Sequence, residues 1–245
     1  MSAPRRLPIS VVVLTYNEER NLRACLESLA GWVTDLFLVD SGSTDATMAI
    51  GEEFGARIVT HRFETHTRQW RWAFANLPLE TEWVLALDAD QRVSPELRDA
   101  IQAAFAAGGT AEDAAGCFLI RRQVFRGRWI KHGGYYPKYL LKLFRRRAVT
   151  LDEGDLVDHH FHVAGRLVRL TGDLIEDNRN EARIFDWIEK HNRYARLQAT
   201  QEIQRLGLGP RPNLWGSPDE RTAWMKSVYA GSIPAARISS AICPR

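Results

Sequence analysis

Short apolar runs alternate with helical patterns through the first half of the chain. The run at residues 9–14 has the length of a strand and is apolar on both faces, as a buried parallel strand requires. The next apolar residues recur at the spacing of one helix face: Leu22, Cys25, Leu26 and Leu29. Further strands are predicted at residues 36–39, 56–60 and 83–87. This alternation predicts an α/β fold, with a doubly wound, mostly parallel sheet and helices on both faces.

Helix signals continue beyond the fourth predicted strand. Ser94 is placed as an N-cap, with Pro95 at the first helical position and Glu96 in the first turn. After residue 120 the alternation fades. A strand at residues 139–144 is still predicted, and so is a long C-terminal amphipathic helix at residues 181–206.

The composition is that of an ordinary globular protein. Of 245 residues, 45% are apolar and 26% are charged, with a net charge of +3, which excludes a disordered or fibrous chain. Three cysteines, odd in number and far apart, indicate a reduced, cytoplasmic protein rather than a disulfide framework. We expect neither a signal peptide nor a membrane-spanning helix, since no run of about 18 apolar residues occurs.

Polar residues follow three of the predicted strands: Thr15, Asn17, Glu18, Asp40, Ser41, Asp88 and Asp90. In an open α/β sheet, ligands bind outside the carboxyl ends of the strands, so these residues are expected at one crevice. Ser43 and Thr44 are interpreted as caps of the next helix, a position that Asp45 could also take. Asp40 and Asp88 are not placed as caps, so the same explanation fails for them.

The pair Asp88 and Asp90 is the sharpest local signal. Residues two apart at a strand end lie on one face, about 6.5–7 Å apart along the backbone. Two carboxylates this close repel each other unless a cation or solvent screens them. Mg²⁺ and Mn²⁺ prefer oxygen ligands, so the pair predicts a divalent-cation site.

Common nucleotide-binding motifs are missing. No GxGxxG follows the first strand and no GxxxxGK[ST] occurs, so a dehydrogenase or P-loop enzyme is not favoured. Instead VVVLTYNEERNLRACLESL, VDSGSTDAT and WVLALDADQRVSPEL, in this order and spacing, resemble family 2 glycosyltransferases with the GT-A fold. The later stretches FLIRRQVFRGRWIKHGGYYPKYLLKLFRR, LVDHHF and KHNRY resemble the bacterial branch that includes lipopolysaccharide-core β-glucosyltransferases.

The resemblance implies roles for the strand-end residues. It implies that four of them hold the base and ribose of a nucleotide-sugar donor: Thr15, Asn17, Glu18 and Asp40. Ser41, in the same donor-binding loop, stands where many members have a second aspartate. Asp88 and Asp90 match the family's DxD motif, which binds the divalent cation and the donor diphosphate. The cation neutralises charge on the departing diphosphate.

The resemblance also implies a catalytic base. Family members invert the anomeric carbon by direct displacement, with a carboxylate taking the proton of the acceptor hydroxyl. The related branch often has a His-Glu pair where this chain reads Asp158-His159. Asp158 is therefore the preferred base and His159 the alternative. Asp173, Glu176 and Asp177 are further carboxylates downstream.

The neighbouring histidines also allow a zinc site. His160 and His162 could share one strand face, with His159 and either Asp155 or Asp158 nearby. The favoured interpretation is that these histidines are polar residues beside an acceptor cleft, because this interpretation does not need the fourth ligand of a zinc site.

A basic strip without acidic residues lies between Asp113 and Asp152. Its cations are Arg121, Arg122, Arg126, Arg128, Lys131, Lys138, Lys142, Arg145, Arg146 and Arg147. Part of it is expected to be a solvated face, and part to contact the donor diphosphate, an anionic acceptor or acidic lipid headgroups. Nucleic acid is not an expected partner, because the rest of the chain is acidic enough to cancel the field.

These features predict an inverting, metal-dependent transferase that moves a sugar from a nucleotide diphosphate to a cell-envelope glycan or lipid-linked acceptor. Residues 1–110 form the expected donor half, 111–210 the acceptor half of the same domain, and 211–245 a truncated, poorly ordered tail. The expected location is the cytoplasm, with peripheral contact at the inner face of the cytoplasmic membrane as an option. Two alternatives stay open: a metal-dependent phosphohydrolase, and a degenerate nucleotide-sugar binding module without turnover.

Overall fold

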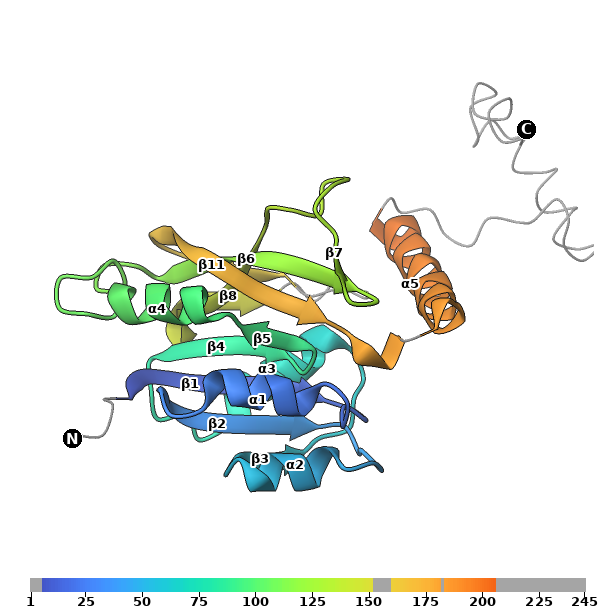
Figure 1. Cartoon of the computed structure of the whole chain (residues 1–245), viewed down its shortest axis with the longest axis horizontal. Helices are drawn as coiled ribbons and strands as arrows, with labels where there is room; N and C mark the ends of the chain where they lie inside the picture. The colour runs from blue at the N-terminus through green and yellow to red at the C-terminus, as the bar shows by residue number, and fades with distance from the viewer. Residues whose placement is uncertain (1–5, 152–159, 182, 206–245) are drawn as a thin grey trace, which may run out of the picture. The chain divides into compact units, whose positions relative to one another are not determined.

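The computed structural model describes residues 6–151, 160–181 and 183–205 (Figure 1). The strands and helices predicted for the first hundred residues are confirmed, and a short strand, β5, is added. The elements in chain order are β1 (Leu7–Thr15), α1 (Leu22–Leu29), β2 (Val33–Asp40), α2 (Thr47–Glu53), β3 (Arg57–Thr60), α3 (His66–Asn76), β4 (Trp83–Asp88), β5 (Gln91–Val93) and α4 (Pro95–Ala104).

The second half contains more strand than the sequence indicated. The predicted strand at 139–144 is confirmed as β8, and the predicted C-terminal helix as α5. The elements are β6 (Gly116–Phe125), β7 (Arg128–Trp129), β8 (Lys138–Arg145), η1 (Arg146–Ala148), β9 (Val149–Leu151), β10 (Phe161–Val163), β11 (Leu167–Asp177), η2 (Arg179–Glu181) and α5 (Ile184–Arg205). One compact unit covers residues 1–195, which include the first part of α5.

One large sheet organises this unit, with strand order β3-β2-β1-β4-β8-β6-β11-β5 and β7 beside β6. The first four strands are parallel to one another, as predicted. Beyond β4 the sheet is mixed, because β8 runs antiparallel to both β4 and β6. A separate two-stranded sheet joins β9 and β10.

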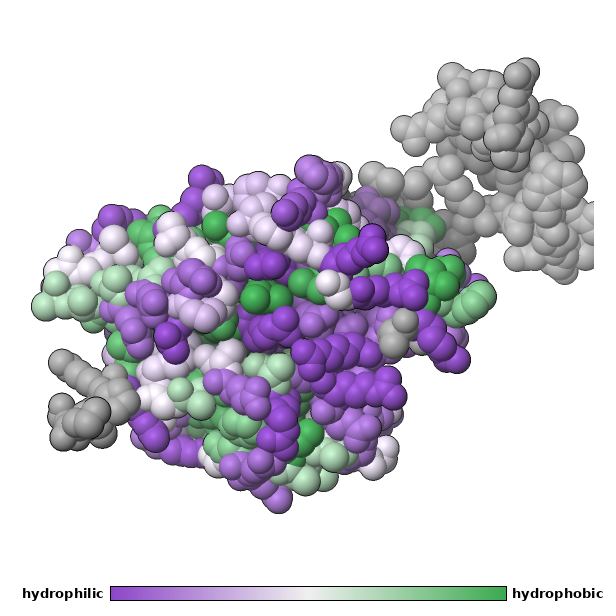
Figure 2. Space-filling model, in the orientation of Figure 1, coloured by the Kyte–Doolittle hydropathy of each residue, from purple (hydrophilic) through white to green (hydrophobic). Residues whose placement is uncertain are grey.

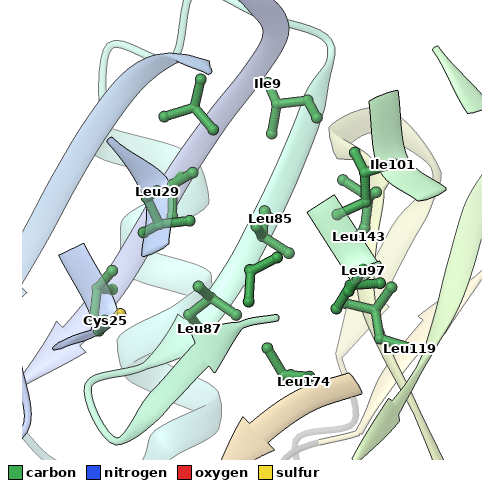
Figure 3. Close-up of a cluster of buried hydrophobic side chains, with 14 of the residues drawn as sticks. Ile9, Cys25, Leu29, Leu85, Leu87, Leu97, Ile101, Leu119, Leu143 and Leu174 are labelled. Carbon is green, nitrogen blue, oxygen red and sulfur yellow. The ribbon is translucent and has the colours of Figure 1, made fainter. Parts of the chain in front are cut away.

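Side chains alternate between two apolar layers, one on each face of the sheet. On one face Val11 and Leu85 pack in a cluster with α1 and α4, whereas Val12 and Val84 pack with α3 on the other. Figure 3 shows the first cluster, where Cys25 and Leu29 of α1 and Leu97 and Ile101 of α4 surround strand residues such as Leu85. Ser94 caps α4 as predicted, since its hydroxyl accepts the backbone N–H of Leu97 at 3.2 Å. The packing of α1 and α4 on one face and of α3 on the other confirms the prediction of helices on both faces.

An irregularity in β11 explains why the sequence did not reveal this strand. Its register with β6 shifts between Arg169 and Asp173, and Gly172 between them has a φ of +86°. A Cβ at Gly172 would lie 2.3 Å from the backbone nitrogen of Leu97, so only glycine allows α4 to approach this closely. The interruption breaks the period-2 pattern on which strand prediction depends.

The molecular face in Figure 2 is mostly hydrophilic, with scattered apolar spots. Within the described ranges, every helix falls short of the combination of length and apolar character that a membrane crossing requires.

Candidate functional site

The ends of β1, β2 and β4 lie side by side. In the sheet register Thr15 pairs with Asp40, and Leu14 pairs with Asp88. Because the three strands run in one direction, the loops that follow them leave the same edge of the sheet. The structure therefore brings together the three polar strand ends.

Asp40 organises the loop after β2. Its side chain is fully buried, and its carboxylate accepts the backbone N–H groups of Gly42 and Ser43, each at 2.8 Å. The hydroxyls of Thr15 and Ser43 also donate to it. Gly42 has a φ of +93°, a conformation that side chains disfavour. Four hydrogen bonds from its own surroundings thus hold the Asp40 carboxylate inside the protein.

The interpretation of Ser43 and Thr44 as helix caps is wrong. The hydroxyl of Ser43 accepts the backbone N–H of Asn17 at 2.8 Å, and the backbone N–H of Thr44 donates to Asn17 Oδ1 at 2.8 Å. The N-cap of α2 is Ala46, and Asp45 before it accepts the N–H of Thr47, the first residue of the helix, at 2.9 Å. Asn17 therefore ties the loop after β1 to the loop after β2.

Glu18 lies in a polar, half-buried position. Its carboxylate accepts Asn21 Nδ2 at 2.7 Å and Asn180 Nδ2 at 3.1 Å. Burial raises the pKa of Glu18 to about 7, and the nearby Asp88 carboxylate adds to the rise, whereas the Asn21 hydrogen bond opposes it. Glu18 therefore changes charge close to neutral pH.

The two aspartates after β4 have different surroundings. Lys142 Nζ of β8 lies 2.9 Å from Asp88 Oδ2, and Lys142 is only 5% exposed. Burial raises the pKa of Asp90 well above its usual range, and the carboxylates of Glu176, Asp88 and Glu18 raise it further. Asp88 thus has a buried cation beside it, whereas Asp90 faces further carboxylates.

Three further residues complete this region: Glu176 and Arg121, named above as a downstream carboxylate and a cation of the basic strip, and Gln91, which sequence reasoning missed. Gln91 accepts the backbone N–H of Asp88 at 3.2 Å and donates from Nε2 to Glu176 Oε2 at 2.9 Å. Arg121 Nη1 donates to Glu176 Oε1 at 3.4 Å. Acidic residues 176–177 follow an apolar run, the same pattern as at the ends of β2 and β4. That pattern is the sequence signal for Glu176, and the basic strip is the signal for Arg121, whereas Gln91 carries none.

A cavity of about 540 Å³ opens at the strand ends. We call it the strand-end cavity; residues that line it include Thr15, Glu18, Ser41, Asp88, Asp90 and Lys142. Its volume is within the range of small-molecule sites. Asn17 and Asp40, also predicted to bind the donor, are not among its lining residues and instead hold its loops in place.

A second cavity of about 590 Å³ adjoins the first. We call it the helix-side cavity, because α5 contributes Trp187, Lys190, His191 and Tyr194 to its wall. The residues that line both cavities are Asp90, Arg121, Lys138, Glu176, Asn178, Lys190 and Tyr194. Asp90 therefore lies where the two cavities meet.

The carboxylates fit a divalent cation by their chemistry. Glu18, Asp88 and Glu176 each raise the pKa of Asp90, a repulsion that a cation would relieve. Within the described ranges, no three His, Cys, Asp or Glu side chains are grouped closely enough to hold an ion by themselves. Mg²⁺ is usually bound by one or two carboxylates and completed by substrate phosphates and water. Asp88 and Asp90 therefore suit a cation that is shared with a diphosphate.

The predicted base lies elsewhere in the chain. Asp158 and His159 fall at residues 152–159, outside the described residues, and so does Asp155. Of the neighbouring histidines, His160 lines the strand-end cavity and His162 is in β10. The part of the chain that the structure describes holds no cluster that fits the zinc alternative.

The basic strip is not one continuous surface. Lys142 is buried beside Asp88, and Arg121 is paired with Glu176. Arg145 also turns inward, since its guanidinium donates to the backbone carbonyls of residues 111, 112 and 114. The strip therefore divides into buried and exposed cations, and the exposed ones include Arg126, Arg128, Lys131, Lys138 and Arg147.

Comparisons with known proteins all point to glycosyltransferases. Residues 10–174 match the family model described as Glycosyl transferase family 2. The chain is 27% identical over 221 residues to LpsC of Rhizobium meliloti, a lipopolysaccharide core biosynthesis glycosyltransferase, covering 86% of this chain and 76% of that protein. It is 35% identical over 98 residues to an uncharacterized glycosyltransferase of Rickettsia felis, a match that covers 40% of this chain and 34% of that protein.

The fold is also similar to that of a solved enzyme. Glucosyl-3-phosphoglycerate synthase from Mycobacterium tuberculosis, crystallised with Mn²⁺, uridine diphosphate and phosphoglyceric acid, has a TM-score of 0.51 and 16% sequence identity. The match covers 83% of this chain and 80% of that chain. This likeness confirms the predicted GT-A-like fold.

Proposed function

Because the chain belongs to glycosyl transferase family 2, we propose that it transfers a sugar from a nucleotide-diphosphate donor, with inversion at the anomeric carbon. The observation that carries the proposal is the strand-end cavity, onto which three strand ends bring polar side chains and a carboxylate pair. Glu18 and Ser41 contact the nucleoside, and Asn17 and Asp40 position the two loops that surround it.

Asp88 and Asp90 hold a divalent cation, Mg²⁺ or Mn²⁺, together with the donor diphosphate. When bound, such an ion neutralises charge on the leaving diphosphate. Lys142 supports the same end of the site, since its ammonium lies beside Asp88 and inside the strand-end cavity. The mycobacterial synthase was crystallised with Mn²⁺ and uridine diphosphate, which supports a divalent cation and a nucleotide diphosphate as the ligands proposed here.

The acceptor hydroxyl approaches from the helix-side cavity. Asp158 is the proposed base, with His159 as the alternative, because the family resemblance points to this pair. Among the downstream carboxylates, Asp173 accepts the hydroxyl of Tyr136 and Asp177 is paired with Arg92, whereas Glu176 lines both cavities. Glu176 accepts hydrogen bonds from Gln91 and Arg121, so both of its carboxylate oxygens are already engaged within the protein.

The acceptor is a cell-envelope glycan or a lipid-linked sugar. Support comes from the lipopolysaccharide core glycosyltransferase of Rhizobium meliloti, which matches most of this chain. We place the protein in the cytoplasm, with contact to acidic lipid at the inner membrane face through the exposed cations around Arg126 and Arg128.

A panel of UDP-, GDP- and dTDP-sugars with Mg²⁺ or Mn²⁺ tests the proposal by thermal shift and nucleotide release. We expect one donor to stabilise the protein and to release its nucleotide faster when acceptor is present. Phosphate release from simple esters would indicate a phosphohydrolase instead. Donor binding without turnover on any acceptor would indicate a binding module.

A further inference from the structure

Two cations face each other across neighbouring strands where the cavities meet. Arg121 of β6 and Lys138 of β8 are direct partners in the antiparallel register, and both line both cavities. Like charges placed directly opposite each other on a sheet are destabilising. The arrangement therefore costs folding free energy unless a negative group lies between the two side chains.

The negative groups among the described residues neutralise this pair only in part. Arg121 Nη1 donates to Glu176 at 3.4 Å, but Arg121 Nε is buried and has no hydrogen-bond acceptor among the described residues. The Arg121 side chain is only 15% exposed. Lys138 makes no ion pair with any of the described residues, and the third shared cation, Lys190, is bound to Glu181. A buried guanidinium N–H without an acceptor is costly, so an external anion is the expected partner.

Aromatic rings form a large part of the remaining wall of the helix-side cavity. Trp187 and His191 are stacked with ring centroids 3.8 Å apart, and Phe125 meets the Trp187 ring edge-on at 5.9 Å. Tyr135 and Tyr194 complete this lining. Flat apolar rings beside a few polar groups form the kind of wall on which a sugar ring with a charged substituent can be oriented.

We propose that the helix-side cavity binds an acceptor sugar that carries a carboxylate or phosphate, with its anion held between Arg121 and Lys138 and its ring beside Trp187. This inference rests on the proposed function, because it identifies the second cavity as the acceptor site. The donor diphosphate is the rival anion. We assign it to Asp88, Asp90 and Lys142, since Lys142 lines only the strand-end cavity.

Calorimetric titration of the full chain, with UDP and Mn²⁺ present, tests the inference with three probes: methyl glucuronide, glucose 6-phosphate and methyl glucoside. We expect one or both anionic sugars to bind at least about tenfold more tightly than the neutral one, a difference typical of hydrogen bonds to charged groups. Whichever of the two binds identifies the anion as carboxylate or phosphate. Arg121→Gln and Lys138→Met should each remove most of this preference. Lys131→Met, an exposed lysine that lines neither cavity, should leave it intact.

Equal binding of charged and neutral sugars would overturn the inference. So would a loss of UDP affinity in Arg121→Gln and Lys138→Met without a change in the sugar preference, because the pair would then hold the donor. Arg121→Lys keeps the charge if Arg121→Gln does not fold. UDP binding by the wild-type protein is measured separately, and its absence would contradict the proposed function rather than the charge preference of the second cavity.

Discussion

The strand-end cavity and the helix-side cavity share a wall but are built in different ways. The loops of the first are held by hydrogen bonds between neighbouring strand ends, such as those that Asp40 and Asn17 accept. The second is bounded by aromatic rings and by cations whose hydrogen-bonding capacity is only partly used. A cavity whose loops are held by hydrogen bonds suits the donor nucleotide, which many enzymes use. A cavity with unpaired charge suits the selection of one kind of acceptor. Substitutions in the two cavities should therefore have different effects.

The largest effect is expected where the cavities meet. Asp90→Asn should lower transfer by about 10²–10³-fold, the usual cost of losing one charge-stabilising group in an active site. The fold should survive, because the change removes a carboxylate whose pKa burial already raises. Nucleotide release measures the loss, and circular dichroism checks the fold. Asp99→Asn, an exposed aspartate on α4, is the matched control. Full transfer activity in excess EDTA would contradict the proposed requirement for a divalent cation.

The second prediction tests whether the strand-end loops depend on a buried carboxylate. Asp40→Asn replaces an oxygen that accepts N–H groups with an amide that donates, so the free energy of unfolding should fall by about 1–3 kcal/mol. Nucleotide affinity should fall with it, because the loop after β2 loses its anchor. Chemical denaturation and UDP titration measure both. A variant that is as stable as the wild type would show that the loop is held by other contacts.

The two cavities also differ in how far they could be predicted from the sequence. The first four strands are parallel and follow one another, so local patterns alone are enough to place the polar residues at their ends together. The helix-side cavity could not be predicted in this way, because it depends on an antiparallel β8, on a β11 interrupted at Gly172, and on the Arg121–Lys138 register. Local patterns carry no information on such long-range pairing. The same limit hid the inward turn of Arg145 and the role of Gln91.

The third prediction concerns pH. The pKa of Glu18 is raised from 4.5 to about 7 in the folded protein, so its protonated form is the one that folding favours. The contribution of Glu18 to the free energy of unfolding is fully present below its unfolded pKa, and it is lost as the pH rises through about 7. Glu18→Gln, which resembles the protonated state, should therefore raise the melting temperature at about pH 8 but not at about pH 4. Glu52→Gln, at an exposed position, is the control. An equal change in melting temperature at both pH values would contradict the raised pKa of Glu18.

The smallest effect is expected outside both cavities. Arg126 and Arg128 are exposed beside the turn between β6 and β7. Reversing both to glutamate should weaken binding to anionic vesicles by about 1 kcal/mol per residue at low salt and leave nucleotide binding unchanged. Arg98→Glu on α4 serves as the control. Vesicle binding that does not weaken with added salt would indicate apolar insertion instead.

The central claim is that the strand-end cavity binds a nucleotide diphosphate together with a divalent cation. Calorimetric titration of UDP, GDP and dTDP into the wild-type protein and Asp90→Asn, each with Mn²⁺ and with EDTA, tests it most directly. We expect one nucleotide to bind the wild type with Mn²⁺ and to bind at least about tenfold more weakly in EDTA or in the variant, because the cation couples diphosphate to carboxylate. Equal affinity under all of these conditions, or no binding of any nucleotide, would contradict the account.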